Sequence, residues 1–267
     1  MSIFGAHALT VGYKHNTVID HCSFSLECGS ITGVLGANGC GKTTLLKAIC
    51  GILPYQGTCT LNGIDMKSLS AKERALLCGY IPQRSGISID IPVLDVVLMG
   101  FHASLGLFDR PTAQMRIAAV QALKTVGLGG METCNYQQLS EGQKQLCILA
   151  RTLVCDHRML ILDEPESALD YAMRYRMLTL LRAAIDRTQG CALVALHDPV
   201  LALNCCDHLL FLADGAAVGM VSPVTDPPEV TERLLRAVYG PVRLMRVPDG
   251  TACGQWVILR EMQEYQA

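Results

Sequence analysis

The sequence has almost no net charge, few aromatic residues and no long hydrophobic run. Its 267 residues carry 22 Lys and Arg against 24 Asp and Glu, which gives a net charge of -2 with histidine neutral. This balance provides no basic surplus for a nucleic-acid partner. A membrane-spanning helix needs about 20 mostly apolar residues in a row, whereas Gly, Pro and polar side chains interrupt the uncharged stretches here. We therefore expect no nucleic-acid partner and no membrane span.

The chain also lacks the marks of a secreted, disulfide-linked protein. Residues 1–10 have neither the basic start nor the continuous apolar stretch of a signal peptide. There are 13 cysteines, but no two have the CxxC spacing of zinc ribbons and redox motifs. We interpret most of them as small buried hydrophobic residues in a reducing cytoplasm.

The composition is that of a folded chain whose surface is partly covered. Hydrophobic residues make up 50% and charged residues 17% of the sequence, and the mean hydropathy is +0.30. These values exclude disorder, which needs low hydrophobicity and high net charge. They also predict that a partner covers some apolar surface, so we do not expect a lone monomer.

Short apolar segments alternate with helical patterns along most of the chain. Strands are predicted at residues 31–35, 79–81, 159–162, 192–196 and 208–212, and mainly helical segments over residues 92–155. Such alternation is typical of a mostly parallel sheet covered on both faces, so the predicted fold class is α/β. Capping boxes at Ser70 and Ser140, and Asp198 before a proline, mark three helix starts. A Pro-rich linker then precedes a last helix and a strand-like end.

The pattern GxxxxGK[ST] lies directly between a predicted strand and a predicted helix. Its residues, with the threonine that follows, are Gly36, Ala37, Asn38, Gly39, Cys40, Gly41, Lys42, Thr43 and Thr44. The glycines let consecutive backbone N–H groups curl around phosphate oxygens, and the N-terminus of the helix adds a favourable dipole. Lys42 would reach the β- and γ-phosphates, and the Thr43 hydroxyl would bind Mg²⁺.

A second chemical signal is the apolar strand that ends in Asp163 and Glu164. Asp163 would hold Mg²⁺ directly or through water, and Glu164 would orient an attacking water or accept its proton. By itself, an acidic pair after a strand is more often a helix cap. Because this pair accompanies a phosphate-binding loop, we favour the catalytic interpretation.

The third signal is the sequence LSEGQ at residues 139–143, which precedes a helix with apolar residues at helical spacing. The Ser140 hydroxyl and the Gly142 amide would form a second anion site at the start of this helix, where Ser140 and Gln143 form the capping box. One chain needs only one site for a γ-phosphate. We therefore predict that the second site meets the nucleotide bound by another copy of the chain.

Together these motifs resemble those of the ATP-binding cassette (ABC) ATPases. In chain order they are the phosphate loop, Gln83, the LSEGQ signature, the Asp-Glu strand end, the segment SALD at residues 167–170, and His197. All six in this order are far more specific than any one alone, and the resemblance covers residues 1 to about 220.

The resemblance implies roles for further residues. Tyr13 would stack on adenine, Gln83 would sense Mg²⁺ and the attacking water, and His197 would bridge the γ-phosphate and Glu164. Asp170 would help to align the facing subunit. Purely structural roles also remain open, in which Tyr13 is a packing residue, Asp170 is a helix cap and His197 is a structural histidine.

The resemblance also implies the architecture. It predicts a P-loop NTPase (RecA-like) core with a mostly parallel sheet, an N-terminal antiparallel β subdomain and an inserted α-helical subdomain. A single ABC ATPase domain would span residues 1–240, with the core and β subdomain in residues 1–83 and 156–222 and the helical subdomain in residues 84–155. Residues 223–267 would form a C-terminal extension.

Three residues within the motifs need separate expectations. Glu141 stands in the signature where Gly is usual: a carboxylate that points outward would be tolerated, whereas one that points inward would repel the triphosphate and weaken dimer closure. Glu166 replaces a common Thr, and we expect no loss of catalysis from it. Cys40 lies inside the phosphate loop, so its oxidation or alkylation is expected to block nucleotide binding.

A finer resemblance concerns the cargo. Residues 91–100 and 231–240 are similar to segments of importers for iron complexes (siderophores or haem), cobalamin and molybdate. We therefore predict the ATP-hydrolysing subunit of an importer, with an iron complex as the best candidate cargo and ATP and Mg²⁺ as cofactors. Its partners would be a second copy in an ATP-sandwich homodimer, membrane permease subunits and, indirectly, a substrate-binding protein. The chain would lie peripherally on the cytoplasmic face of the cell membrane.

Three alternatives remain open at this stage. Soluble ABC proteins that act on ribosomes or chromosomes usually have two cassettes or long coiled coils, and neither is visible here. A nucleotide-gated interaction module that barely hydrolyses ATP would not need Glu164 and His197. An exporter subunit often includes its own membrane span.

Overall fold

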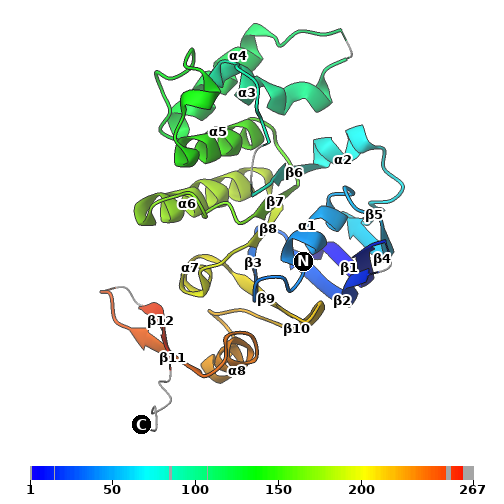
Figure 1. The fold of residues 1–267 in the computed structure, drawn as a ribbon, viewed down its shortest axis with the longest axis vertical. Helices are drawn as coiled ribbons and strands as arrows, with labels where there is room; N and C mark the ends of the chain where they lie inside the picture. The colour runs from blue at the N-terminus through cyan, green and yellow to red at the C-terminus, as the bar shows by residue number, and fades with distance from the viewer. Residues whose placement is uncertain (1, 15, 84–85, 107, 251–253, 261–267) are drawn as a thin grey trace.

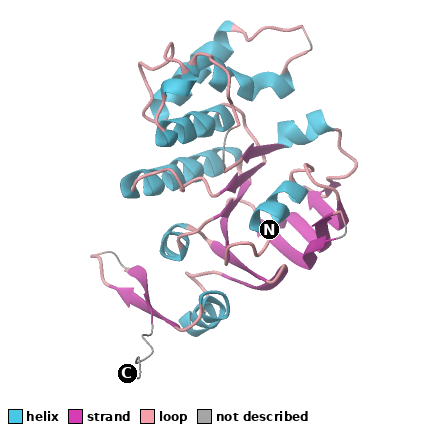
Figure 2. Ribbon diagram, in the orientation of Figure 1, coloured by secondary structure: helices cyan, strands magenta, loops and turns pink. Residues whose placement is uncertain are grey.

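Figure 1 shows a computed structural model of the chain, which describes residues 2–14, 16–83, 86–106, 108–250 and 254–260. A central sheet lies between a small antiparallel sheet on one side and a group of helices on the other (Figure 1). The last helix and a two-stranded hairpin lie at the far end of the molecule from the helical group (Figure 2).

The central sheet has six strands in the order β10-β9-β3-β8-β7-β6. Five of them run parallel, and β10 pairs antiparallel with β9 at one edge. The middle strands are buried along their whole length because both faces of the sheet are covered. The bounds are β3 Ile31–Gly36, β6 Cys78–Ile81, β7 Met159–Asp163, β8 Cys191–Ala195, β9 His208–Ala213 and β10 Ala216–Val221.

The second sheet is antiparallel, with the order β2-β1-β4-β5. Helix α1 (Lys42–Ile49) lies between the two sheets, and its residues Leu45, Leu46 and Ile49 are fully buried there. Alternate residues of a strand face opposite sides, so Ile161 of β7 joins this core while its neighbours face the helices. The strand bounds are β1 Ser2–Tyr13, β2 Asn16–Glu27, β4 Tyr55–Leu61 and β5 Ile64–Asp65.

The helical group contains α3, α4 and α5, which pack on one another. Helix α6 lies between this group and the sheet (Figure 1). The apolar side of α5 is buried, as its spacing of hydrophobic residues predicts. The bounds are α2 Ala71–Leu77, α3 Val93–Leu98, η1 Met99–Ser104, α4 Ala113–Thr125, η2 Tyr136–Gln138, α5 Glu141–Leu153 and α6 Tyr171–Thr188, where η marks 3₁₀ helices.

In the C-terminal part, α8 packs on β9 and β10, and the terminal hairpin contacts α7. Asn204 of α7 donates a hydrogen bond to the Trp256 carbonyl (3.0 Å) and accepts one from the Trp256 N–H (2.8 Å). These two bonds fix the terminal hairpin against the helix. The bounds are α7 Pro199–Cys205, α8 Pro228–Tyr239, β11 Val242–Val247 and β12 Gln255–Arg260.

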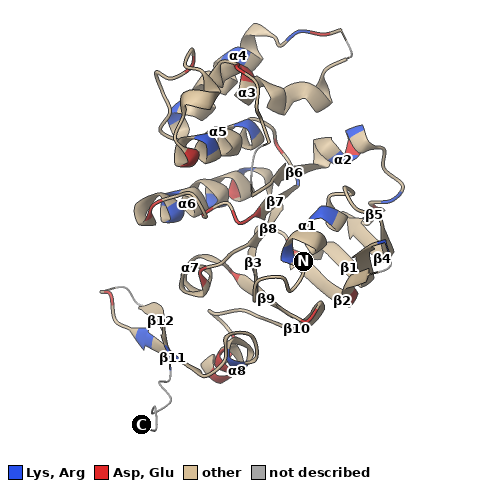
Figure 3. Cartoon of the chain, viewed as in Figure 1, with Lys and Arg blue, Asp and Glu red and all other residues tan. Residues whose placement is uncertain are grey.

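The structure confirms the α/β class, the antiparallel N-terminal sheet and the helical insertion. It also confirms the capping boxes of Ser70 and Ser140 and the cap of Asp198 before α7. The division of the chain at residues 83, 156 and 223 stays a prediction. Within the described residues no helix is long and apolar enough to cross a membrane. Acidic and basic residues are scattered over several elements in this view rather than gathered on one (Figure 3).

Candidate active site

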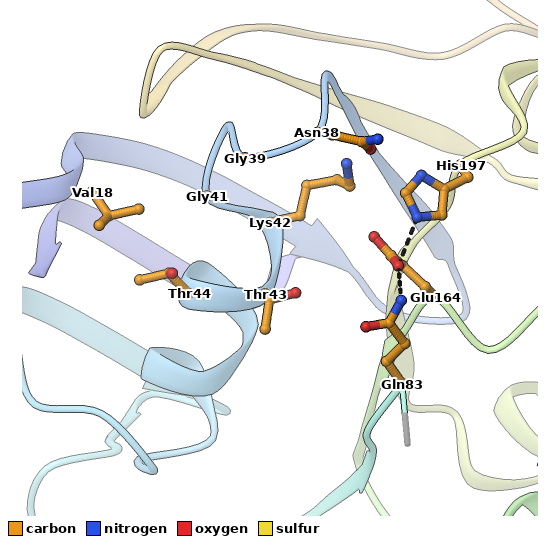
Figure 4. Close-up of a pocket in the computed structure, with 10 residues that line it drawn as sticks. All are labelled: Val18, Asn38, Gly39, Gly41, Lys42, Thr43, Thr44, Gln83, Glu164 and His197. Atoms are coloured by element: carbon orange, nitrogen blue, oxygen red, sulfur yellow. Dashed lines mark hydrogen bonds and ion pairs between the residues drawn. The ribbon is translucent and has the colours of Figure 1, made fainter. Parts of the chain in front are cut away.

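Four neighbouring parallel strands deliver polar residues to one edge of the central sheet. β3 leads into the phosphate loop, β6 into the segment with Gln83, β7 into Asp163 and Glu164, and β8 into His197. The carboxyl ends of parallel strands in an open α/β sheet form the usual ligand crevice. Residues as far apart as 43 and 197 therefore meet in one place (Figure 4).

The phosphate loop turns sharply between β3 and α1. Gly41 caps α1 with φ 106°, a left-handed conformation that favours glycine. A Cβ at Gly41 would also lie 2.6 Å from Ile19 of the antiparallel sheet. Only glycine fits this position, and the loop leads directly into the start of α1, where a helix N-terminus favours an anion.

Lys42 and Thr43, the first residues of α1, point toward the crevice (Figure 4). The Lys42 ammonium donates a hydrogen bond to the Gly36 carbonyl at 2.8 Å, which holds it over the loop. The Thr43 hydroxyl donates to the Asp163 carboxylate at 2.9 Å. A cation, a hydroxyl and a carboxylate thus face the same space from two elements.

Glu164 turns toward the loop because its backbone is left-handed. Its φ is 50°, which is unusual for a residue with a side chain, and its N–H donates to the Ala195 carbonyl of β8 at 3.1 Å. The side chain is buried, and one oxygen has two close neighbours. Gln83 Nε2 donates to Glu164 Oε2 at 2.5 Å, and His197 Nε2 lies 2.6 Å from the same oxygen.

The carboxyl group of Asp163, at the end of β7, differs in its pKa from a carboxyl group in water. Burial raises the pKa of Asp163, and the nearby Glu164 adds to the rise. The Thr43 hydrogen bond and the positive charges of Lys47 and Lys42 oppose it. A cation bound beside Asp163 would favour its charged form.

These side chains surround a cavity of about 360 Å³ (Figure 4). Nine of the predicted catalytic and binding residues line it: Asn38, Gly39, Gly41, Lys42, Thr43, Thr44, Gln83, Glu164 and His197. The lining also includes Val18 of β2, which the sequence did not single out. No local motif marks Val18, because the antiparallel sheet brings it to the loop from outside the motif.

Other predicted site residues do not line this cavity. The start of α5, with Ser140, Gly142 and Gln143, lies elsewhere on the chain, and Ser140 is exposed. Tyr13 at the end of β1 is 47% exposed and does not line the cavity either. Asp170 caps α6 by accepting a hydrogen bond from the Met173 N–H.

The signature turn is fitted closely to the segment after β7. A Cβ at Gly142 would lie 3.0 Å from the Ala168 carbonyl oxygen, so a side chain there would press on this backbone. Glu141 is exposed and pairs with Lys144 at 2.8 Å. Its carboxylate thus has a partner on its own helix, and its orientation toward a nucleotide stays open.

Two further residues of the motifs have environments that the sequence did not reveal. Cys40 is buried beneath the phosphate loop, and a Cβ at Gly36 would lie only 2.4 Å from its Sγ. Glu166 is 2% exposed, and its Oε1 accepts a hydrogen bond from the His197 N–H at 2.8 Å. No local motif marks this contact, because residues 166 and 197 follow different strands.

Comparison with known proteins places these motifs in a family. The family model for ABC transporters matches residues 19–167. The hemin import ATP-binding protein of Rhizobium leguminosarum is 34% identical over 253 residues, which cover 91% of this chain and 93% of that protein. A probable iron chelatin transport ATP-binding protein of Helicobacter pylori is 34% identical over 233 residues, 86% of this chain and 90% of that protein.

A solved structure is similar over nearly the whole length. It is a chain of a transporter assigned to the metal-chelate type of ABC transporters, in an inward-facing conformation, with a TM-score of 0.81 and 26% identity. The similarity covers 98% of this chain and 99% of that chain. The family match, the relatives and the fold agree with the motifs at the sheet edge, and the chain belongs to the ABC transporter family as an ATPase subunit.

Proposed function

We propose that this chain hydrolyses ATP to drive uptake of an iron complex, a siderophore or haem, through a membrane permease. The observation that carries the ATPase part is the cluster at Glu164, whose carboxylate contacts Gln83 and His197 beside the phosphate loop. The cargo part is supported by the hemin and iron chelatin transport names of the relatives. Both relatives match this chain over most of its length.

The triphosphate would lie along the phosphate loop at the start of α1. Backbone N–H groups of residues 37–44 and the helix dipole would bind the phosphate oxygens, and the Lys42 ammonium would move from the Gly36 carbonyl to the β- and γ-phosphates. Tyr13 would stack on adenine, since its ring is accessible at the end of β1.

The oxygen donors at the sheet edge fit Mg²⁺. This ion takes one or two carboxylates together with phosphate oxygens, and the Thr43 hydroxyl and Asp163 carboxylate already lie 2.9 Å apart. We propose these two, with the Gln83 carbonyl, as its protein ligands. Among the described residues no group of three His, Cys, Asp or Glu would hold a metal alone, so phosphate oxygens would complete the site. When bound, Mg²⁺ neutralises charge on the β- and γ-phosphates.

Hydrolysis needs a water aligned with the γ-phosphate and a group to take its proton. Glu164 would accept that proton as the water oxygen attacks phosphorus and ADP leaves. Gln83 would orient the water through its amide. His197 would hold the γ-phosphate and Glu164 together, because its Nε2 already lies 2.6 Å from the carboxylate.

A second copy would supply the missing wall of the site. Ser140, Gly142 and Gln143 lie outside the cavity of their own chain, and Ser140 is exposed at a helix N-terminus that favours anions. In a head-to-tail homodimer this turn would close over the triphosphate bound by the partner. Hydrolysis would remove the shared anion and open the dimer, a ligand-driven switch between two states.

Transport would then require contact between this homodimer and integral membrane permease subunits, which in turn receive cargo from a substrate-binding protein. The chain would sit peripherally at the cytoplasmic face of the cell membrane. Proteoliposomes that contain the chain and its permease, with the binding protein outside, test the proposal by ATP-dependent uptake of labelled haem or ferric siderophore. Uptake that stops with Glu164→Gln would support it. Active ATP hydrolysis without uptake of either iron complex would overturn the cargo assignment.

A further inference from the structure

Glu166 is a buried acid that the proposed reaction does not use. It lies between β7 and α6 and is only 2% exposed. A fully buried Glu is rare unless it is paired, yet no basic side chain pairs with it among the described residues. Its Oε1 accepts a hydrogen bond from the His197 N–H at 2.8 Å, while its Oε2 is buried without a partner.

The surroundings of Glu166 shift its pKa in both directions. Burial is the main cause that raises the pKa of Glu166, and the nearby Glu164 carboxylate adds to the rise. Hydrogen bonds from the backbone N–H groups of His197 and of Glu166 itself, together with the His197 ring, oppose it. In either protonation state the carboxyl group keeps an oxygen that can accept from an N–H. The contact with His197 therefore depends on this acceptor atom and not on the charge of the side chain.

The N–H of His197 depends on this acceptor. The preceding N–H, of Leu196, donates to Val34 of β3, so the sheet ladder extends to that residue. The following residue, Asp198, is already the cap of α7. His197 stands between the last ladder bond and the first helical residue, so neither the sheet nor the helix supplies an acceptor for its N–H. Glu166 supplies the acceptor from the neighbouring strand connection.

The side chain of His197 starts from this fixed backbone. Its Nε2 lies 2.6 Å from Glu164 Oε2, although 43% of the histidine side chain is exposed. An exposed ring has few packing contacts to hold it, so the position of its backbone largely decides where the ring lies. Glu164 is anchored on the same side, two residues before Glu166 and with its N–H on Ala195. One short connection thus positions both partners of the ion pair.

We propose that Glu166 is a positioning residue for hydrolysis: its Oε1 holds the His197 backbone so that the imidazole reaches Glu164 and the γ-phosphate. The inference rests on the proposed ATPase function of this site and goes beyond it. It is compatible with the sequence-based expectation that Glu in place of Thr at residue 166 causes no loss of catalysis, and it assigns this Glu a role. Glu166 acts through His197, so it should affect the rate of cleavage and not the binding of nucleotide.

Two variants of Glu166 separate the acceptor from the charge. Glu166→Gln keeps the length and a carbonyl acceptor, and we expect kcat for ATP hydrolysis within about 3-fold of the wild type. Glu166→Met keeps the length and removes the acceptor, and we expect kcat to fall about 10-fold with KM unchanged, because the His197 N–H loses its partner. A fall in Glu166→Gln as large as in Glu166→Met would overturn the proposal. So would an unchanged kcat in Glu166→Met.

Measurements in a His197→Ala variant distinguish a positioning role of Glu166 from a general loss of folding or stability. In a His197→Ala chain no imidazole remains to be held, so adding Glu166→Met should lower the residual single-turnover rate no further. The same 10-fold loss in both backgrounds would show that Glu166 acts independently of the ring and would overturn the proposal. Absence of ATP hydrolysis in the wild type would instead refute the proposed function itself.

Controls address folding. Thr32→Val removes another buried polar atom without a partner, on β3 and outside the cavity lining, and should leave kcat unchanged. ATP affinity and Tm are measured for every variant. Should Glu166→Met fail to fold, Glu166→Leu and the Gln variant decide the question by the same comparison of kcat. A Gln variant that folds but loses activity would still overturn the proposal.

Discussion

Two helices of this protein begin in ways that suit an anion, but their surroundings differ. Helix α1 starts at the phosphate loop, beside Thr43, Glu164 and a cavity of about 360 Å³. Helix α5 starts at a capping box, with an exposed Ser140 and no part in that cavity. Around the first start lie the Lys42 ammonium and the Asp163 and Glu164 carboxyl groups, whereas the second has the capping serine and the exposed Glu141–Lys144 pair. We therefore expect the first to bind nucleotide and the second to contact nucleotide only on a partner.

This difference indicates what each copy would contribute to nucleotide binding and to turnover. The α1 end would bind nucleotide without help, because its contacts all come from one chain. The α5 end would matter only after a partner brings a triphosphate to it. Variants at the two ends should therefore separate binding from turnover, and the size of their effects tests that separation.

The largest effect is expected from Glu164→Gln at the α1 end. Loss of a general base lowers kcat by about 100- to 10,000-fold. The amide has the same size as the carboxylate, so ATP binding should be unchanged. ATP should then accumulate a dimer, measured by light scattering alongside phosphate release. Glu229→Gln, at an exposed position at the start of α8, is the control with the same chemical change. An ATP-bound monomer of the Glu164 variant would contradict the shared site.

The next largest effect is expected from Lys42→Ala, also at the α1 end. A hydrogen bond to a charged group contributes about 1.5–3 kcal/mol, so ATP affinity of the isolated chain should fall roughly 10- to 100-fold. Isothermal titration measures the affinity. Lys124→Ala, an exposed lysine in the last turn of α4, serves as the control. Unchanged affinity in the Lys42 variant would count against the position of the phosphates.

A smaller effect is expected from Ser140→Ala, which tests the α5 end. Its matched control is Ser70→Ala, because both serines are exposed and both form a capping box with the residue three positions later. Each variant should lose about 1 kcal/mol of helix-cap stability. Only Ser140→Ala should lower steady-state turnover, by about 10-fold, with ATP affinity of the isolated chain intact. Equal turnover in the two variants would remove the reason for placing Ser140 at a partner's nucleotide.

The smallest effect concerns Asp170. Asp170→Asn keeps the oxygen that accepts the Met173 N–H and removes only the charge. If Asp170 aligns the facing subunit, the ATP-induced dimer of this variant should be weaker by about 2- to 5-fold, the range of an exposed ionic contact. Asp170→Ala should in addition lower the free energy of unfolding by about 1 kcal/mol through loss of the cap. An unchanged dimer affinity in Asp170→Asn would leave capping as its whole role.

Much of this architecture could be predicted from short-range patterns. Buried parallel strands read as continuous apolar runs, and the caps at Ser70, Ser140 and Asp198 follow from residues within three positions. The phosphate loop also depends on short-range contacts, since its glycines determine the local turn and Lys42 bonds to a carbonyl of the same loop. The predicted positions of these strands, caps and loop are confirmed because they depend mainly on residues close together in the sequence. The roles of the site residues stay predictions.

What the sequence could not predict depends on contacts between distant segments. The antiparallel sheet has register shifts in β1, and Ala8 and His21 have positive φ without being glycine, so no residue type marks them. Val18 reaches the cavity only through this sheet. In the sequence, Glu in place of Thr at residue 166 is a change within a motif with no evident effect. Its contact with the His197 N–H forms only because the segments that follow β7 and β8 lie next to each other.

The seven residues that join β7 to α6 have a consequence for how this chain can vary. Every second one has a different contact: Glu164 with the glutamine and histidine, Glu166 with a backbone N–H, Ala168 with the signature glycine, and Asp170 with the first turn of α6. Inserting or deleting a single residue early in the segment would displace the contacts that follow it relative to the one at Glu164. Length, more than composition, is therefore the property of this connection that homologous chains should share.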